Sequence, residues 1–334
     1  MLLIPTNKCK QSMPSVNATE IEPVFSTVLI AFICLQQLVF ILAFLGNIFV
    51  IIIFVKYLKL KTATNKFVVS MSIADLCTGV SAGVQVLYFF IFSLNTDMVA
   101  CFLRYQVLTW MTITSQALVT FTTFDRFVAI CFPHYHKHLV TKRVSNMLII
   151  TAWIFGALSA MIPFAGANNW GSGVSCMFYD LLFHRFVYLI YGISIFLFMG
   201  IAVVLYCFIL HTAWKYQSRI RPRNSLNVER QKKIEKDIRS ARVMAFVTVI
   251  FTVCWTPYTV FQIRYGLGIS SDELYSLSNW LVFLGISNSI MNPFIYAWQR
   301  NDFRRKWFEL MPCFGKNSTG RETSMTQNLS SIGS

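Results

Sequence analysis

Polar side chains that could bind a cation interrupt long apolar stretches of this sequence. Asp75 lies near the middle of one stretch, and Asn288, Ser289 and Asn292 lie within another. Removing a carboxylate from water is costly unless it gains a partner charge, hydrogen bonds or a proton. A hydrated sodium ion held by carboxylate, amide and hydroxyl oxygens, including that of Ser115, would meet this need. The alternative is a protonated Asp75 that is hydrogen-bonded between helices.

The elements that hold these residues are apolar enough to lie in a membrane. The chain has 334 residues, 55% of them hydrophobic and 13% charged, whereas soluble domains carry roughly 25% charge. Seven apolar blocks are each long enough to cross a hydrocarbon core of about 30 Å, where a helix satisfies its own backbone. We therefore predict an all-α membrane protein with a seven-transmembrane helix bundle. The blocks are residues 26–56, 65–93, 99–132, 143–164, 185–214, 238–266 and 273–298.

Basic residues are divided unevenly between the two sides of such a bundle. If the N-terminus lies outside, the inner loops and tail hold most of the Lys and Arg residues behind the net charge of +15. This asymmetry follows the positive-inside rule of membrane proteins. The positive charge therefore does not indicate that the protein binds nucleic acid. We predict a multi-pass plasma-membrane protein with an extracellular N-terminus. Because the first residues lack a signal-peptide pattern, the first segment is expected to serve as its own insertion signal.

Four regions follow from this arrangement: an extracellular N-terminus, the seven-helix domain, an amphipathic helix on the inner membrane surface, and a disordered cytoplasmic tail. They span residues 1–25, 26–298, 299–311 and 312–334. The sequon at Asn17 lies outside and predicts glycosylation. Cys313 follows the amphipathic helix, where palmitoylation is expected; a plain exposed thiol is the alternative.

Six groups of residues stand in order along the predicted helices. They are Asn47, Asp75, Asp125-Arg126-Phe127, Trp153, Cys254-Trp255-Thr256-Pro257 and Asn292-Pro293-Phe294-Ile295-Tyr296. Together they resemble the motifs of the rhodopsin-like, or class A, family of G-protein-coupled receptors over residues 26–311. The resemblance implies a receptor that binds an extracellular ligand and activates a heterotrimeric G protein by opening the cytoplasmic end of segment six. It also implies the sodium site, contact with membrane lipid and an arrestin-like partner.

The same resemblance implies a switch at the inner ends of the segments. In relatives, an acid at the inner end of segment six pairs at rest with the segment-three Arg, which corresponds to Asp237 and Arg126 here. The alternative is that Asp237 is a solvated loop charge. Pro257 removes a helix hydrogen bond and lets segment six kink. Tyr206 and Tyr296 resemble inner tyrosines that stabilise the active arrangement, and simple helix packing is the alternative.

Two positions depart from the family pattern. Phe127 stands where Tyr is usual, and coupling is still expected because family members vary there. Segment five has no Pro between residues 185 and 206, and Phe198 occupies its place. The family's account of how segment five bulges and moves therefore does not transfer to this chain.

Cysteines at the outer side are expected to be oxidised. Cys101 begins segment three and Cys176 lies in the loop before segment five. In the family this pair is bridged, and both residues face the oxidising side of the membrane. Cys9 is then an outer cysteine to which no partner is assigned.

The sequence gives little support for an enzyme or a transporter. It has no HExxH motif, no Ser/His/Asp grouping and no paired carboxylates within the membrane, so we predict that it is not an enzyme. His134, His136 and His138 alternate in the second inner loop; a G-protein contact loop is favoured over a metal site. A seven-helix transporter or channel-like protein is the alternative function, but inverted repeats and interrupted helix pairs are not visible.

Two ligand classes are disfavoured and one is suggested. Residues 273–298 contain no Lys for a retinal Schiff base, and Leu108 stands where amine receptors place an Asp. The runs 168–170 and 176–180 resemble the second outer loop of adenosine receptors, in which Phe178 would match the Phe that stacks on adenine. However, Tyr179, Gln262 and Ile286 replace a Glu, an Asn and a His that hold adenosine.

A site built for hydrogen bonds rejects a ligand that leaves them unmade. The ligand is therefore adenosine-like or, as the favoured alternative, a different small organic molecule or a peptide. Eight side chains are expected to line its cavity: Leu108, Thr109, Thr112, Phe178, Trp255, Tyr258, Gln262 and Val282.

Overall fold

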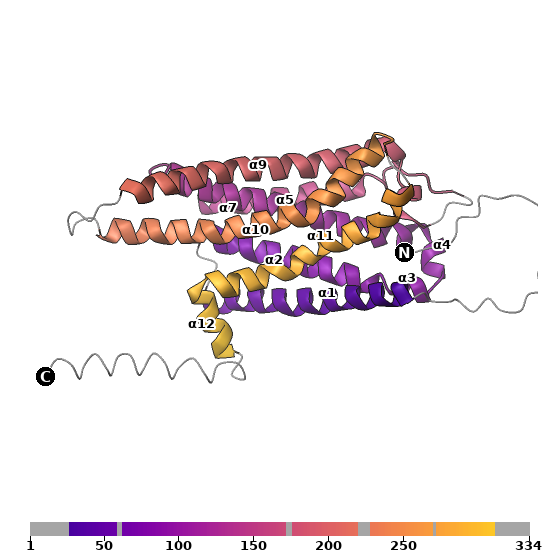
Figure 1. Cartoon of the computed structure of the whole chain (residues 1–334), viewed down its shortest axis with the longest axis horizontal. Coiled ribbons are helices and arrows are strands. Elements are labelled where there is room, and N and C mark those ends of the chain that lie inside the picture. The colour runs from indigo at the N-terminus through magenta and orange to yellow at the C-terminus, as the bar shows by residue number, and fades with distance from the viewer. Residues whose placement is uncertain (1–26, 59–61, 172–175, 220–227, 270–271, 311–334) are drawn as a thin grey trace, which may run out of the picture.

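The computed structural model describes residues 27–58, 62–171, 176–219, 228–269 and 272–310 (Figure 1). Asn17, Cys9 and Cys313 lie outside these residues, and so do the predicted terminal regions 1–25 and 312–334. Asp237 lies within a described helix, but its side chain is outside the description. The predicted glycosylation, palmitoylation and Arg126–Asp237 pair therefore stay predictions.

Seven long helices of the described chain lie side by side along one axis and form a bundle (Figure 1). They are α1 (Thr27–Ile52), which continues into the π-helical η1 (Ile53–Leu58), α2 (Ala63–Val84), α5 (Met98–Cys131), α7 (Lys142–Met161), α9 (His184–Arg219), α10 (Val228–Gly266) and α11 (Asp272–Gln299). Each overlaps one predicted block, so the fold prediction is confirmed. The bounds differ most for α2, which ends at Val84 whereas its block was expected to reach residue 93, and for α10, which begins at Val228 whereas its block was expected to begin at residue 238. Shorter helices are α3 (Leu87–Phe90), α4 (Ser93–Thr96), α6 (His136–Leu139), α8 (Phe178–Leu181) and α12 (Asn301–Leu310).

The third long helix, α5, is the buried centre of the bundle. It packs against α2, α7, α9 and α10, which bury polar side chains such as Gln106, Thr114 and Gln116. Six other helices of the described chain are long and apolar enough to cross a membrane, and α5 is too polar to be counted with them. Its surroundings explain the difference, because a helix enclosed by other helices can carry polar groups that lipid would not accept.

The peripheral helices turn large apolar side chains outward. Leu38, Ile41 and Leu45 are exposed on α1, and Phe196 and Leu197 are exposed on α9. A soluble protein rarely exposes apolar surface on this scale. Lipid is the surrounding that removes these side chains from water, so the bundle is a multi-pass membrane domain.

Glycines set the distance between helices at two places near the centre of the bundle. A Cβ atom on Gly46 would lie 2.8 Å from the Cγ atom of Pro293, where α1 meets α11. A Cβ atom on Gly285 would lie 2.8 Å from two ring atoms of Trp255, where α11 meets α10. Small residues permit such close packing, which drives helix association in membranes.

The last helix, α12, turns away from the bundle axis after α11 (Figure 1). Phe303 is fully buried and its ring lies 5.8 Å from that of Phe54, while the Trp307 ring lies 5.3 Å from that of Phe49. Arg304 and Arg305 are exposed. One face of α12 therefore packs on the bundle while basic side chains cover another, as predicted for residues 299–311.

Candidate functional site

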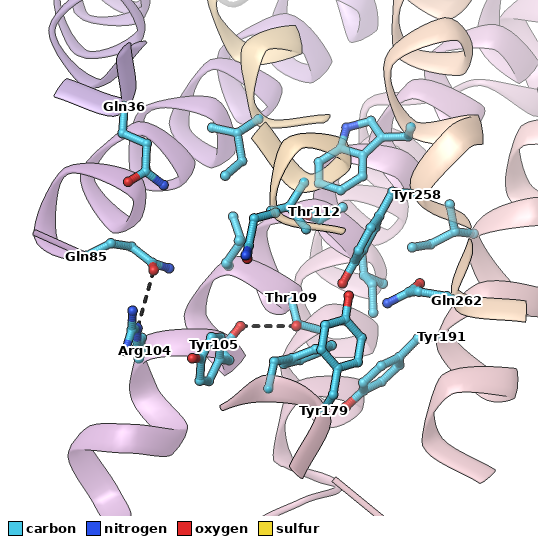
Figure 2. A pocket seen from close by; sticks show the side chains of 18 of the residues that line it. Gln36, Gln85, Arg104, Tyr105, Thr109, Thr112, Tyr179, Tyr191, Tyr258 and Gln262 are labelled. Atoms are coloured by element: carbon cyan, nitrogen blue, oxygen red, sulfur yellow. Dashed lines mark hydrogen bonds between the residues drawn. The ribbon is translucent and has the colours of Figure 1, made fainter. Parts of the chain in front are cut away.

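A cavity lies among the helices at one end of the bundle (Figure 2). Tyr105 in its wall contacts Cys176 of the Cys101–Cys176 disulfide, so we call this end the disulfide end. The cavity has about 930 Å³ of empty volume, its open mouth included. Side chains of α1, α3, α5, α8, α9, α10 and α11 contribute to its wall, as does Gln85 directly after α2. All eight residues predicted to contact a ligand line it: Leu108, Thr109, Thr112, Phe178, Trp255, Tyr258, Gln262 and Val282.

The disulfide holds one wall of the cavity in place. Cys101 and Cys176 are bonded, which confirms the predicted pair. The hydroxyl of Tyr105 donates to the Cys176 carbonyl at 3.1 Å, and the Tyr105 and Phe178 rings lie 5.3 Å apart. These contacts fix the segment that carries Phe178 and Tyr179 against α5. The cavity is thus bounded by a covalently tied loop as well as by helices.

Trp255 is a wall residue that packs between two long helices, α10 and α11. Only 4% of this residue is exposed, and its ring centroid lies 6.1 Å from those of Phe251 and Tyr258 on α10. On its other side the indole meets the backbone of Gly285 on α11. Trp255 therefore belongs to the cavity wall and packs against α11 as well as against its own helix, α10.

Polar groups gather at two opposite sides of the cavity (Figure 2). On one side the Nε atom of Arg104 donates to Oε1 of Gln85 at 3.3 Å. On the other side the hydroxyl groups of Tyr179 and Tyr258 lie beside the amide of Gln262. The middle of the cavity is mainly apolar and aromatic. This pattern suits a ligand with polar groups at both ends and an apolar body.

A second polar site surrounds Asp75, whose residue is 1% exposed. The hydroxyl of Ser289 donates to one carboxylate oxygen at 3.1 Å, and the Nδ2 atom of Asn292 donates to the other at 2.6 Å. The side-chain oxygens of Ser115, Asn288 and Asn292 are buried without a hydrogen-bond partner among the described protein atoms. A carboxylate with unpartnered hydroxyl and amide oxygens on the surrounding helices fits a hard cation such as sodium.

Two further motif residues join helices near this level. The Nδ2 atom of Asn47 donates to the carbonyls of Ala43 and Ser289, both at 2.9 Å, and so ties α1 to α11. The indole nitrogen of Trp153 donates to the Ser70 hydroxyl at 2.9 Å and ties α7 to α2. Both residues stabilise the contacts between neighbouring helices.

At the opposite end, which we call the basic end, Arg126 pairs with its neighbour Asp125. The Nη2 atom of Arg126 lies 2.6 Å from Oδ2 of Asp125. The same carboxylate accepts a hydrogen bond from the Thr64 hydroxyl at 3.0 Å and lies 3.1 Å from Nε2 of His136. Thr64 of α2 and His136 of α6 thus fix the buried Asp125 carboxylate, which in turn binds the Arg126 side chain.

Two buried tyrosines lie between these sites. Tyr206 on α9 lies beside Thr123 and Thr248 and close to the Arg126 guanidinium. The hydroxyl of Tyr296 on α11 is buried and has no hydrogen-bond partner among the described protein atoms. A phenol held in this way can gain a hydrogen bond if the helices rearrange.

The helices α9 and α10 differ in whether a Pro interrupts their backbone hydrogen bonds. Pro257 lies inside α10, where it removes a backbone hydrogen bond. By contrast, α9 passes without a Pro through Phe198, whose carbonyl accepts a hydrogen bond from the Thr120 hydroxyl at 3.1 Å. The same hydroxyl bonds the Gln116 carbonyl of its own helix. The Thr120 hydroxyl therefore joins α5 to α9 at the level of Phe198.

Several site residues were not singled out by the sequence. No role was assigned to Arg104 from the sequence, although its spacing of four from Leu108 places both on one face of a helix. Gln36, Gln85 and Tyr105 also line the cavity. His136 was assigned to a contact loop, and no sequence pattern indicated that it reaches Asp125.

Comparison with known proteins agrees with this geometry. The family model described as "7 transmembrane receptor (rhodopsin family)" matches residues 46–296, and the chain belongs to that family. Its members are receptors rather than enzymes, and their partners are G proteins and ligands. The chain is accordingly a rhodopsin-like G-protein-coupled receptor, as the motifs predicted.

Among similar proteins are adenosine receptors. The human adenosine receptor A2b is 26% identical over 308 residues, covering 84% of this chain and 89% of the receptor. The dog adenosine receptor A2a is 27% identical over 305 residues, covering 84% of this chain and 72% of the receptor. A crystal structure of squid rhodopsin has the same fold, with a TM-score of 0.69 at 20% identity, and the match covers 84% of this chain and 85% of that one.

Proposed function

We propose that this receptor binds a small extracellular ligand in the cavity at the disulfide end and signals by opening the basic end of α10. The single observation that carries this proposal is the position of Trp255. Its indole lines the cavity and packs on Gly285 of α11, while its own helix continues to the basic end. Pro257 follows two residues later and provides a weak point about which α10 can bend.

The proposed orientation places the disulfide end and the N-terminus outside the cell, in the plasma membrane. Disulfides persist in oxidising compartments, which supports this side for Cys101 and Cys176. Exposed basic side chains at the opposite end include Lys142, Arg143 and Arg304, as expected for cytoplasmic loops. The same surface is where a G protein or an arrestin-like protein would bind, with α12 against anionic lipid.

The resting state is proposed to be stabilised by the Asp125–Arg126 pair and its neighbours Thr64 and His136. Asp237 is proposed as an additional partner of Arg126 from α10. Activation would then exchange these contacts for new ones as the basic end of α10 moves outward. Tyr206 and Tyr296 are placed to supply hydroxyl groups to the rearranged contacts.

The site around Asp75 is proposed to bind sodium and to favour the resting state. The donor set supports this, because Ser115, Asn288 and Asn292 offer buried oxygens that have no hydrogen-bond partner within the described part of the protein. Sodium would supply the positive charge that the buried carboxylate otherwise lacks, and the protein residues would fix its position. A ligand that selects between two conformations must bind them unequally, and inward movement of α11 would close this small site.

An adenosine-like ligand remains the second candidate for the cavity. Phe178 does line it, as the stacking residue of such a ligand should. However, Tyr179, Gln262 and Ile286 also line it, and these residues replace three polar partners in the adenosine receptors. A different small organic ligand is therefore favoured.

The test is nucleotide exchange by the purified chain in lipid nanodiscs with each class of heterotrimeric G protein. We expect GDP release to be faster than with the G protein alone and to fall to background in Arg126→Ala. Arg264→Ala, which changes an exposed side chain at the disulfide end, is the matched control and should keep wild-type exchange. Ion or solute flux through vesicles without any exchange would instead support a transporter.

A further inference from the structure

Arg104 is a cation buried in the wall of the cavity. Only 7% of the residue is exposed, and of the described residues that line the cavity it alone is charged. Its Nε atom donates to Gln85 at 3.3 Å and its Nη1 atom donates to Oδ1 of Asn95 at 3.2 Å. The guanidinium carbon lies 4.6 Å from the ring centroid of Tyr88 and 5.2 Å from that of Tyr105.

These neighbours stabilise the guanidinium without neutralising it. Amide oxygens and aromatic faces carry partial charges only, and among the described residues no carboxylate forms an ion pair with Arg104. Asp97, which precedes α5 on the same side of the membrane, is exposed and accepts the backbone N–H of Ala100 at 2.8 Å. A buried charge without a counterion is expensive, and the described residues that line the cavity supply one positive charge and no negative charge.

We propose that the ligand of this receptor is a small organic anion whose carboxylate or phosphate group pairs with Arg104. The inference rests on the proposed function, in which this cavity is the ligand site. A planar guanidinium with several donors suits either anionic group, because it can offer two parallel hydrogen bonds. The adjacent amide of Gln85 can reorient to donate as well.

The rest of the cavity defines the body of such a ligand. The wall also contains Leu108, Phe178 and Trp255, which suit a flat apolar or aromatic group. Tyr258 and Gln262 lie across the cavity from Arg104 (Figure 2). The proposed ligand therefore has an anionic end, an aromatic middle and a hydrogen-bonding group at the other end. An ammonium ligand would meet repulsion from Arg104 and find no carboxylate among the described residues of the wall.

A purely structural role is the competing explanation. In that case Arg104 ties α5 to the segment that carries Tyr88 and Asn95, and the charge of a ligand would not matter. The two explanations differ in one observable, which is whether binding discriminates between an anion and its neutral counterpart. Testing this requires pairs of compounds of nearly equal shape and binding measured without a G protein.

The probes are indole-3-acetate with indole-3-acetamide, and adenosine 5′-monophosphate with adenosine. Each is added to the purified full chain in nanodiscs, and binding is measured by thermal shift and by isothermal titration. We expect at least one anion to bind about tenfold or more tightly than its neutral partner, as a charge-assisted hydrogen-bonded pair should. The carboxylate pair and the phosphate pair show separately which anionic group is accepted.

Variants assign this preference to Arg104. Arg104→Gln should abolish the preference, Arg104→Lys should retain part of it, and Arg264→Gln should leave it unchanged as an equal loss of charge outside the cavity. If Arg104→Gln does not fold, the wild type and Arg104→Lys still decide the question. The proposal is overturned if anions and neutral partners behave alike in the wild type, whether both bind or neither does. Because G-protein exchange is measured separately, that result would leave the proposed signalling function standing.

Discussion

Gly285→Ala tests whether Trp255 couples the cavity to α11. The added Cβ atom would lie 2.8 Å from Cε3 and Cζ3 of the indole and 2.9 Å from Cδ2. Carbon atoms in contact prefer a separation of about 3.5–4.0 Å, so the ring or the helix must retreat by at least about 0.7 Å. Trp255 is enclosed by Phe251 and Tyr258, and the cavity is the open space beside it.

The cost of this displacement can be separated from the effect of alanine on the helix. Overpacking of a core typically costs about 1–3 kcal/mol, whereas alanine in a helix is favoured over glycine by roughly 0.5–1 kcal/mol. Gly200 on α9 provides the control, because nothing lies within 4 Å of a Cβ atom there. Gly200→Ala carries the helix effect alone, so Gly285→Ala should be less stable than Gly200→Ala by about 1–3 kcal/mol.

Two measurements on both variants complete this test. Thermal unfolding in nanodiscs gives the difference in stability, and nucleotide exchange without ligand reports the balance of resting and active states. We expect Gly285→Ala to be destabilised and to change the exchange rate, because the shifted indole would occupy part of the ligand cavity. Gly200→Ala should show neither effect. Equal stability and equal exchange in the two variants would refute the coupling through Trp255.

Three further predictions concern the site around Asp75 and the residues at the basic end. Replacing N-methylglucamine chloride by sodium chloride at constant ionic strength should slow ligand-free nucleotide exchange in the wild type and not in Asp75→Asn; an equal response of both proteins would exclude the sodium site. Asp237→Ala should raise basal exchange at matched expression, and an unchanged rate would show that Asp237 is a solvated charge. His136→Ala removes one hydrogen bond from the Asp125 carboxylate, and because such a bond contributes about 0.5–1.5 kcal/mol, the resting state should weaken by roughly 2- to 12-fold. His138→Ala, which changes an exposed neighbour in the same loop, should not alter exchange, and identical rates in the two His variants would contradict the role of His136.

The sequence was sufficient for the number and order of the long helices, because each apolar block is long enough to cross a membrane. The resemblance to adenosine receptors led to Leu108, Thr109 and Thr112 as cavity residues, and the structure has all three in the cavity wall. The motif residues Asp75 and Asn292 were expected near one another, and the structure brings them within hydrogen-bonding distance.

Contacts between distant segments could not be predicted in the same way. The burial of Arg104 depends on the turn after α2 and on the short helices α3 and α4, which bring Tyr88 and Asn95 over its guanidinium. The apolar run through residues 84–92 hides that turn, because hydropathy does not report where a helix is interrupted. Likewise, His136 reaches Asp125 only because α6 packs against α5. The periodicity of the local sequence does not predict that contact.

The central claim is that α10 moves at its basic end when the receptor couples to a G protein. The most direct measurement is the distance between spin labels at Arg239 on α10 and Arg143 on α7, both of which are exposed, after replacement of the exposed Cys34 and Cys207. Distances are compared for the receptor alone and for its complex with a nucleotide-free G protein, with Arg126→Ala as the control that should not form the complex. The account predicts a second, longer distance population in the complex, and an unchanged distribution in a complex that still exchanges nucleotide would contradict it.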